Sequence, residues 1–211
     1  MIILDHEQGT DEWFAARLGK PSASNFGKLI TTTGKPSASA DNYIHELIAE
    51  RLTGKSEPFY INEHMQRGTE LEPEAREAYE YITDYKVTEH GFILDDSKEF
   101  GCSPDGIIYH NPKYMTGVEI KCPAAKTMVK YSLDPQSLGK AYYQQIQGCM
   151  LVTGAASWDA FAFHPQIPPV LVTFCRDEGF IEKLADEVNK AVNVILNHVE
   201  KLNERLRAER Q

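Results

Sequence analysis

Two acidic residues and one lysine lie on either side of a turn near the middle of the chain. The segment CSPDGIIYHNPKYMTGVEIKCP, residues 102–123, contains Asp105, then Glu119, and Lys121 two positions after the glutamate. Alternate side chains of a strand share a face, so Glu119 and Lys121 project together while Ile120 points into the core. If the chain folds back over the turn, antiparallel pairing brings Asp105 close to both of them.

A cluster of this composition suits the hydrolysis of a phosphodiester. Two carboxylates at this range repel each other unless a cation or a proton lies between them, and oxygen ligands suit Mg²⁺ or Mn²⁺ better than zinc. The cation would lower the pKa of a water and offset charge on the phosphorus, while Lys121 could hold or deprotonate that water or stabilise the transition state. The alternative is an exposed hairpin with one Glu/Lys pair, worth roughly a few tenths of a kcal/mol.

The hairpin needs other elements to position it. Apolar spacing with Gly or Pro stops predicts helices, and runs of β-formers between turn residues predict strands. The helical stretch that contains Pro73 is expected to kink there or to be two helices with Pro73 in a first turn. The expected helices are residues 41–54, roughly 62–82, 138–152 and a long amphipathic one from 179 onward; the expected strands are 86–94, 106–110 and 117–121, which look like a meander, then 157–164 and 170–175. We therefore expect one α/β domain, residues 1–211, with a mixed central β-sheet flanked by helices.

The composition is that of an ordinary globular protein. The chain has 211 residues, 42% apolar and 25% charged, and a net charge of −9, which argues against a whole surface devoted to polyanions but permits a local basic groove. Its four cysteines have no CxxC spacing, so buried free thiols are expected. No apolar run is long enough to span a bilayer, and the start of the chain lacks the features of a secretion signal. We expect a soluble, cytoplasmic protein with no membrane partner.

The hairpin also matches a known motif, PD-(D/E)xK, written here as Pro104-Asp105 and then Glu119-Ile120-Lys121. More narrowly, the chain resembles the lambda-exonuclease family of phage recombination nucleases, also called viral recombinases. The resemblance covers most of the chain, through EQGTDEWFAARLGKPSAS, RGTELEPEA, GCSPDG, GVEIKCP and AYYQQIQ in that order. It implies a restriction-endonuclease-like fold and a Mg²⁺-dependent 5′-to-3′ exonuclease on linear double-stranded DNA, for which Mn²⁺ substitutes. The product would carry 3′ single-stranded overhangs for phage-type recombination by strand annealing.

The resemblance implies a metal site and catalytic residues on the hairpin. Asp105, Glu119 and the backbone carbonyl of Ile120 match the family's Mg²⁺ ligands, and Lys121 takes the place of its catalytic lysine. The first three positions also agree with the oxygen ligands that Mg²⁺ prefers.

Two helices are expected to add polar groups to this site. Glu72, in RGTELEPEA, matches a helical acid of the family that could hold a second metal or its water, and Glu70 is a neighbour that could be mistaken for it. The alternative is that both acids simply complement a helix start near Pro73. Gln145, in AYYQQIQ, matches a glutamine close to the metal, although a glutamine on a helix is more often just solvated.

An exonuclease that starts from an end must recognise that end. Arg17 and Ser24, in ARLGKPSAS, match the family's 5′-phosphate pocket, and Ser103 would join them; the alternative for Ser24 is a helix cap. The sequence departs from the family after the catalytic lysine, where an arginine is replaced by Lys126, one position out of register. Met65 falls where a related protein has an apolar wedge that separates the terminal base pair, although a helical methionine is more often core packing.

The resemblance also implies partners and an assembly. The family forms a ring of three subunits around the duplex and works with a single-strand annealing protein, in the cytoplasm of a bacterial host if the gene belongs to a phage or prophage. Two alternatives remain open. One is an endonuclease of the same superfamily, structure-specific or sequence-specific, and the other is a catalytically silent DNA-binding subunit on a nuclease fold.

Overall fold

The computed structural model describes residues 1–56, 63–111 and 114–209, with the side chains of 63–65 and 114 excepted. Its central element is a sheet of four strands in the order β4-β5-β6-β7. These strands are β4 (Gly106–Asn111), β5 (Tyr114–Lys121), β6 (Ser157–His164) and β7 (Ile167–Cys175). β5 pairs with β4 antiparallel and with β6 parallel, and β7 is antiparallel to β6. The sheet is therefore mixed, as the sequence predicted.

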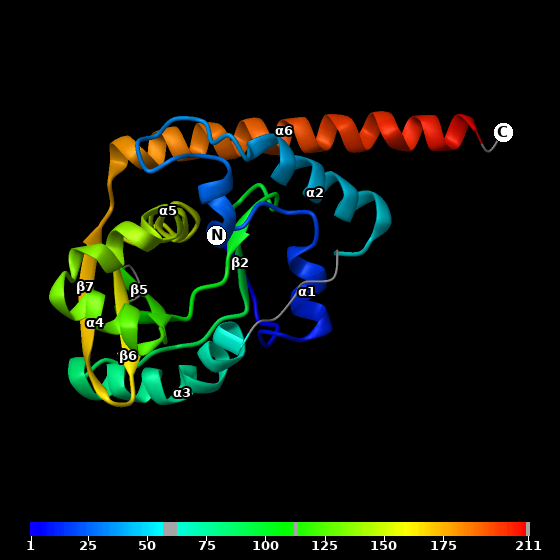
Figure 1. Ribbon diagram of the computed structural model, residues 1–211. Coiled ribbons are helices and arrows are strands. Elements are labelled where there is room, and N and C mark those ends of the chain that lie inside the picture. Colours follow the sequence, from blue (N-terminus) through cyan, green and yellow to red (C-terminus); the bar gives the residue numbers. More distant parts are fainter. Residues whose placement is uncertain (57–62, 112–113, 210–211) are drawn as a thin grey trace.

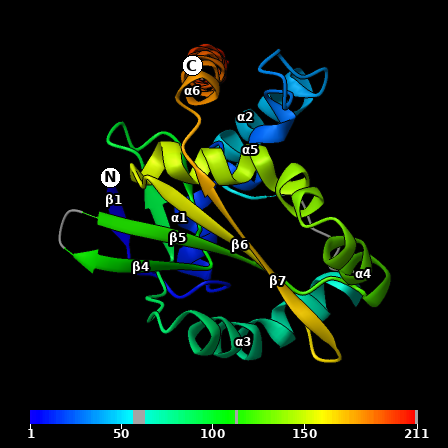
Figure 2. The same ribbon diagram turned by 90° about the vertical axis from the view of Figure 1, so that its left-hand side faces the viewer.

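Helices cover both faces of this sheet, as Figures 1 and 2 show. On one face, Ala75 and Tyr79 of α3 (Glu63–Thr83) pack with β-strand residues such as Val118 and Phe161. On the other, α5 (Gln136–Thr153) buries residues such as Ile146 in the main core. The parallel connection from β5 to β6 runs through α4 (Ala125–Leu133) and α5. The expected α/β architecture is confirmed.

A second, smaller sheet brings the chain to the hairpin. It has the order β1-β2-β3, formed by β1 (Ile2–Leu4), β2 (Phe92–Leu94) and β3 (Gly101–Cys102). The expected strand 86–94 is therefore wrong in its first part, where only Thr88 forms an isolated bridge, to Ile107. In residues 86–90 only Val87 is apolar, so that segment has no face to bury, whereas β2 is buried throughout. The three strands expected as a meander belong to two sheets.

The remaining helices include two that the sequence analysis did not predict. α1 (Asp11–Arg17) and the short 3₁₀ helix η1 (Ala23–Lys28), like α4, are too short for a clear apolar period. α2 (Ala40–Thr53) ends at Gly54 with φ 67°, as expected, but its cap is Ser39, and Asp41 lies inside its first turn. α3 is one helix that continues through Pro73, rather than two. α6 (Glu178–Ala208) is the long amphipathic helix, and it runs beside α2 (Figure 1).

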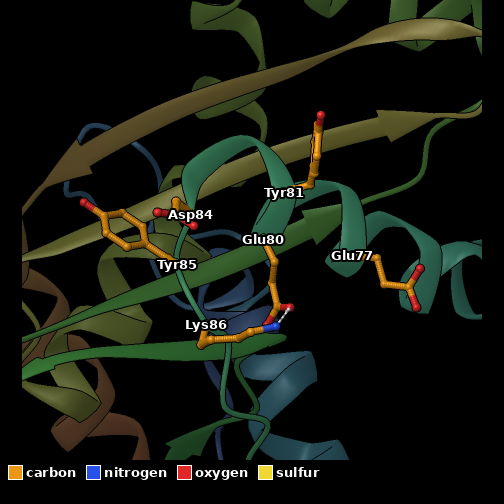
Figure 3. Close-up of a pocket in the computed structure, with 6 residues that line it drawn as sticks. All are labelled: Glu77, Glu80, Tyr81, Asp84, Tyr85 and Lys86. Carbon is orange, nitrogen blue, oxygen red and sulfur yellow. Dashed lines mark hydrogen bonds and ion pairs between the residues drawn. The ribbon is translucent and has the colours of Figure 1, made fainter.

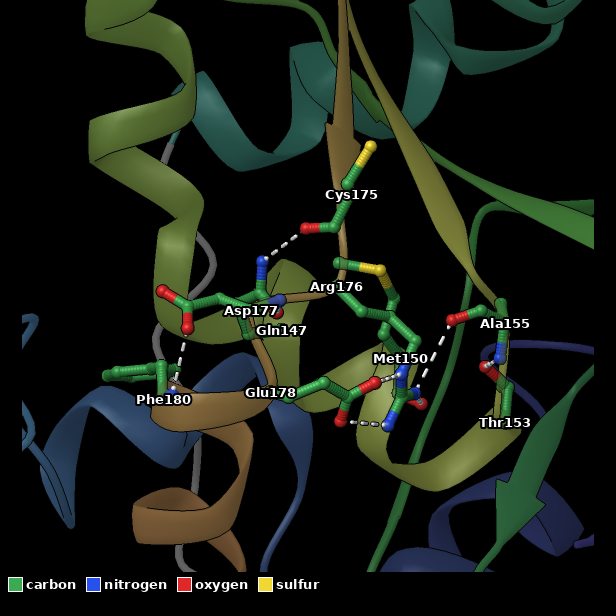
Figure 4. A network of polar contacts seen from close by, with 9 residues as sticks. All are labelled: Gln147, Met150, Thr153, Ala155, Cys175, Arg176, Asp177, Glu178 and Phe180. Atoms are coloured by element: carbon green, nitrogen blue, oxygen red, sulfur yellow. Dashed lines mark hydrogen bonds and ion pairs between the residues drawn. The ribbon is translucent and has the colours of Figure 1, made fainter.

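A polar network holds α5 against the junction of β7 and α6 (Figure 4). The side chain of Gln147 donates to Cys175 O at 3.0 Å and accepts from Asp177 N at 2.9 Å. Arg176 donates to the carbonyls of Met150 and Ala155. Asp177 also caps α6, because its side chain accepts from the backbone N–H of Phe180. These bonds fix the position of α5 on the sheet.

All four cysteines are free, as expected, but they are not all buried. Cys102 and Cys149 are buried, Cys122 is half-buried and Cys175 is exposed. Cys175 ends β7, an edge strand whose side chains are alternately exposed, which explains the wrong expectation for this residue. In the described ranges, no helix combines the length and apolar character needed to cross a membrane.

Candidate active site

The β4–β5 hairpin brings Asp105 and Glu119 together. Gly106 pairs with Val118, so the next position outward places Asp105 opposite Glu119, as the sequence predicted. Asp105 Oδ2 accepts from the backbone N–H of Ile120 at 2.6 Å, which holds the carboxylate beside β5. A side chain at Gly106 would clash with Val87, so glycine lets the strand pass close to that residue.

Glu119 is a buried carboxylate with one oxygen bonded and one oxygen free. Its side chain is 1% exposed. Oε1 accepts from Lys121 Nζ and from Gln145 Nε2, the latter at 2.6 Å, whereas Oε2 has no partner among the described residues. Burial, and then the charge of Asp105, raise the pKa of Glu119 to about 7. An acceptor left unbonded at this depth costs free energy unless a cation or proton satisfies it.

Lys121 is enclosed by the acids and by an aromatic ring. Its Nζ donates to Glu119 and lies 5.1 Å from the ring centroid of Tyr142, a cation–π contact. Burial alone would lower the pKa of Lys121, but the charges of Glu119 and Asp105 outweigh burial and raise it. Tyr142 has non-helical backbone angles, φ −120° and ψ 16°, inside α5. Tyr142 was not among the residues predicted from the sequence, although its position three residues before Gln145 on a helix was an available signal.

Glu72 of α3 lies near the same acids. It is half-buried, and burial followed by the charge of Asp105 raises its pKa. Arg76 binds Glu72 at 2.8 Å and reaches Glu89 at 2.9 Å, a pair of contacts that the sequence analysis missed. Glu70 is exposed and accepts from Gln66 on the helix surface. Because α3 does not start near Pro73, the helix-start explanation for the two acids is wrong.

A second cluster, around Arg17, adjoins the first through Ser103. Arg17 Nη1 donates to Ser103 Oγ at 2.7 Å, and Trp13 Nε1 donates to the same oxygen at 3.1 Å. The guanidinium lies 4.2 Å from the Trp13 ring centroid and 5.3 Å from that of Phe92. Burial lowers the pKa of Arg17, and no carboxylate among the described residues lies within ion-pair distance of it. A half-buried cation without a counter-ion, bound to a serine that lies two positions before Asp105, suits an anionic ligand.

The other predicted residues are not joined to these clusters. Ser24 is exposed inside η1, where its Oγ lies 3.2 Å from Ser22 Oγ, and the described contacts include none from Ser24 to Arg17 or Ser103. The cap of η1 is Ser22, so the capping alternative for Ser24 is also wrong. Lys126 is exposed on the first turn of α4. The side chain of Met65 lies outside the described residues.

The donor set at the hairpin fits a hard divalent cation. Asp105 and Glu119 supply carboxylate oxygens, and Glu119 Oε2 is the buried acceptor without a partner in the described part of the chain. Carboxylates and carbonyls are the ligands that Mg²⁺ and Mn²⁺ prefer. No group of three or more His, Cys, Asp or Glu side chains within the described ranges is arranged to hold a metal, so water or backbone oxygens would complete such a site.

A surface hollow elsewhere on the molecule does not belong to this site. It lies at the carboxyl end of α3 and is lined by Glu77, Glu80, Tyr81, Asp84, Tyr85 and Lys86, with Lys86 bound to Glu80 (Figure 3). Tyr85 packs on His110, which lies at the opposite end of β4 from Gly106. The acidic lining of this hollow is unsuited to a phosphate.

Solved structures share this fold. An alkaline exonuclease, LHK-Exo, from Laribacter hongkongensis has a TM-score of 0.82 and 35% identity, covering 94% of this chain and 99% of its own. The structure of LHK-Exo in complex with dAMP matches equally well. A phage-related exonuclease from Haemophilus somnus 129PT has the same fold, with a TM-score of 0.68 and 19% identity over 87% of this chain and 96% of its own. Together with the acidic hairpin, the 35% identity to LHK-Exo over most of the chain defines the protein as a hydrolytic nuclease.

A comparison with models of protein families assigns the chain more closely. The model of the YqaJ-like viral recombinase domain matches residues 12–156, which include both Arg17 and the hairpin. The chain therefore belongs to the YqaJ-like viral recombinase family, which confirms the resemblance that the sequence motifs predicted. A comparison with curated proteins finds no match.

Proposed function

We propose that the protein is a Mg²⁺-dependent exonuclease that degrades linear double-stranded DNA from its 5′ ends. The observation that supports this most directly is the pairing of the half-buried Asp105 with the buried Glu119 beside Lys121, with Glu119 Oε2 unbonded among the described residues. Acids that repel each other across a gap are stabilised by a divalent cation, and a lysine at the same place can neutralise charge on a phosphate.

Asp105, Glu119 and the backbone carbonyl of Ile120 would hold the metal. The Ile120 N–H points to Asp105. Because the N–H and C=O of one strand residue point to the same side, its carbonyl is expected to face the same gap. Bound Mg²⁺ supplies Lewis-acid stabilisation of the phosphate and a lower pKa for a water, and Mn²⁺ is expected to substitute.

The surrounding residues orient the acids and the attacking water. Gln145 holds Glu119 Oε1, which leaves Oε2 as the carboxylate oxygen available to a cation. Lys121, with its ammonium form favoured, stabilises negative charge on the phosphorane-like transition state. Glu72, fixed by Arg76, is placed to accept a hydrogen bond from the water or to contribute to a second metal.

Arg17 and Ser103 would bind the terminal 5′-phosphate. Arg17 is stacked on Trp13 and bound to Ser103, so its fork is already ordered before a phosphate arrives. Its partner Ser103 lies two residues before Asp105, which suits a substrate whose first phosphate is bound while the next linkage is cut. LHK-Exo has been crystallised with dAMP, a mononucleotide of the kind that a 5′-to-3′ exonuclease releases. Ser24 and Lys126 are exposed and make no described contact with Arg17 or Ser103, so they are not assigned to this pocket.

The product and assembly follow from the same proposal. Removal of one strand leaves 3′ single-stranded overhangs, onto which a single-strand annealing protein would load. A homotrimeric ring would let a protein of net charge −9 hold DNA, because only the channel needs to be basic.

The test compares three substrates with and without Mg²⁺: linear duplex with 5′-phosphate, linear duplex with 5′-hydroxyl, and closed circular duplex. The proposal predicts mononucleotide release from linear DNA only, faster with 5′-phosphate. Cutting of the circle would indicate an endonuclease of the same fold. Binding of duplex without any metal-dependent product would indicate a catalytically silent subunit.

A further inference from the structure

Arg67 of α3 contacts the segment that leaves the catalytic strand. Its Nη1 donates to the backbone carbonyl of Pro123 at 3.0 Å, and Pro123 follows Lys121 by two residues. The side chain is half-buried, so part of the guanidinium still reaches solvent. This contact fixes a cation beside the point where β5 leads into α4.

The charge of Arg67 has no acidic partner among the described residues. One carbonyl bond uses only part of the donor capacity of a guanidinium, so other N–H groups stay available. Other arginines of the chain are neutralised by nearby acids: Arg51 by Glu99 at 2.6 Å, Arg76 by Glu72 at 2.8 Å and Arg176 by Glu178 at 3.0 Å. Arg67 therefore resembles Arg17, the other half-buried arginine without a counter-ion in the described ranges.

The charge of Arg67 also lies close to the catalytic acids along the chain, because Pro123 follows Lys121 by two residues. Cys122 lies between Lys121 and Pro123, so Arg67 and the acids act on the same short segment. A polyanionic strand that approaches Asp105, Glu119 and Glu72 meets repulsion, which a free guanidinium at the rim offsets.

We infer that Arg67 binds an internal phosphodiester of the strand being degraded, next to the one that is cut. This inference rests on the proposed function and adds a second phosphate-binding position to it. Arg17 is bound to Ser103, which precedes Asp105 in the chain. Arg67 is bound to Pro123, which follows Lys121. The two arginines thus bind different phosphates: Arg17 the terminal one, and Arg67 one that is present in every substrate, whatever its 5′ end.

The test uses Arg67→Gln and Arg67→Lys, with Arg207→Gln as a control that removes the same charge from an exposed position on α6. Binding of linear duplex is measured without divalent metal over a range of salt concentrations, and KM and kcat are measured with Mg²⁺. Arg67→Gln is expected to reduce the slope of log K against log salt by about 0.9, one phosphate contact. It should raise KM roughly tenfold, equally for 5′-phosphate and 5′-hydroxyl ends, with a smaller effect on kcat. Arg67→Lys should keep the salt slope, and the control should change neither value.

Other outcomes overturn the inference. An unchanged salt slope with a reduced kcat would mean that Arg67 only ties α3 to Pro123. A loss confined to 5′-phosphorylated DNA would place Arg67 in the terminal pocket instead. In either case wild-type, Mg²⁺-dependent degradation of linear duplex would leave the proposed function standing, whereas the absence of that degradation would refute the function itself.

Discussion

Replacing Glu119 by glutamine is predicted to stabilise the metal-free protein at alkaline pH. A carboxyl whose pKa is higher in the folded protein than in the unfolded chain destabilises the fold once it ionises. For Glu119 the pKa values in the folded protein and in the unfolded chain are about 7 and 4.5, a difference that corresponds to roughly 3 kcal/mol at 1.36 kcal/mol for each pH unit. The penalty is absent below about pH 4.5, grows as pH rises and is complete above about pH 7. Glu119→Gln removes it.

Thermal unfolding in EDTA, at pH 5 and pH 8, measures this effect. At roughly 2 to 4 °C for each kcal/mol in a chain of this size, the variant should unfold up to about 10 °C above the wild type at pH 8. At pH 5 the two proteins should nearly coincide. Added Mg²⁺ should raise the melting temperature of the wild type by mass action but not that of the variant, which should also lose nuclease activity.

Glu182→Gln is the matched control, because Glu182 is an exposed glutamate of α6. It should leave stability, the Mg²⁺ effect and activity unchanged. The reasoning is refuted if Glu119→Gln is less stable than the wild type at pH 8, since Glu119 would then be a stabilising ion-pair partner. A Mg²⁺ response retained by Glu119→Gln would show that the cation binds elsewhere.

Three other predictions follow from the same contacts. Lys121→Ala should lower kcat by orders of magnitude with folding and DNA binding largely retained, as measured by circular dichroism and by binding titration; equal losses of stability and activity would contradict its role. Arg17→Gln should remove the preference for 5′-phosphate over 5′-hydroxyl ends in a degradation assay, and a preference that survives would exclude Arg17 from the pocket. Tyr79→Phe should cost roughly 1 to 3 kcal/mol in chemical denaturation, because Tyr79 donates to the buried Asp159 at 2.6 Å, with turnover unchanged.

The hairpin could be predicted from the sequence because its geometry is local. The period of two along β5 places Glu119 and Lys121 on one face, and the pairing across a short turn sets Asp105 opposite them. The prediction that Glu72, and not Glu70, belongs to the site depended on the resemblance to the nuclease family, because both acids lie in one turn of the same helix. The structure distinguishes them through burial, with Glu72 half-buried and Glu70 exposed.

The contacts that position these groups come from distant parts of the chain. Arg76 reaches Glu89 across the connection between α3 and β2, and Trp13 of α1 reaches Ser103. Such pairs depend on how the helices dock on the sheets, which no local period encodes. The strand wrongly expected at residues 86–90 has a local cause instead, because Val87 is the one apolar residue there and the segment has no face to bury.

The central claim is that Asp105, Glu119 and Lys121 form a metal-dependent site for cutting DNA from its ends. Digestion of a linear duplex, labelled at one 5′ end and in separate samples at one 3′ end, tests it most directly. With Mg²⁺, the account predicts immediate release of labelled mononucleotide from the 5′ label, while the 3′-labelled strand stays intact until late in the reaction. Degradation that proceeds equally well in EDTA, or that releases the 3′ label first, would contradict it.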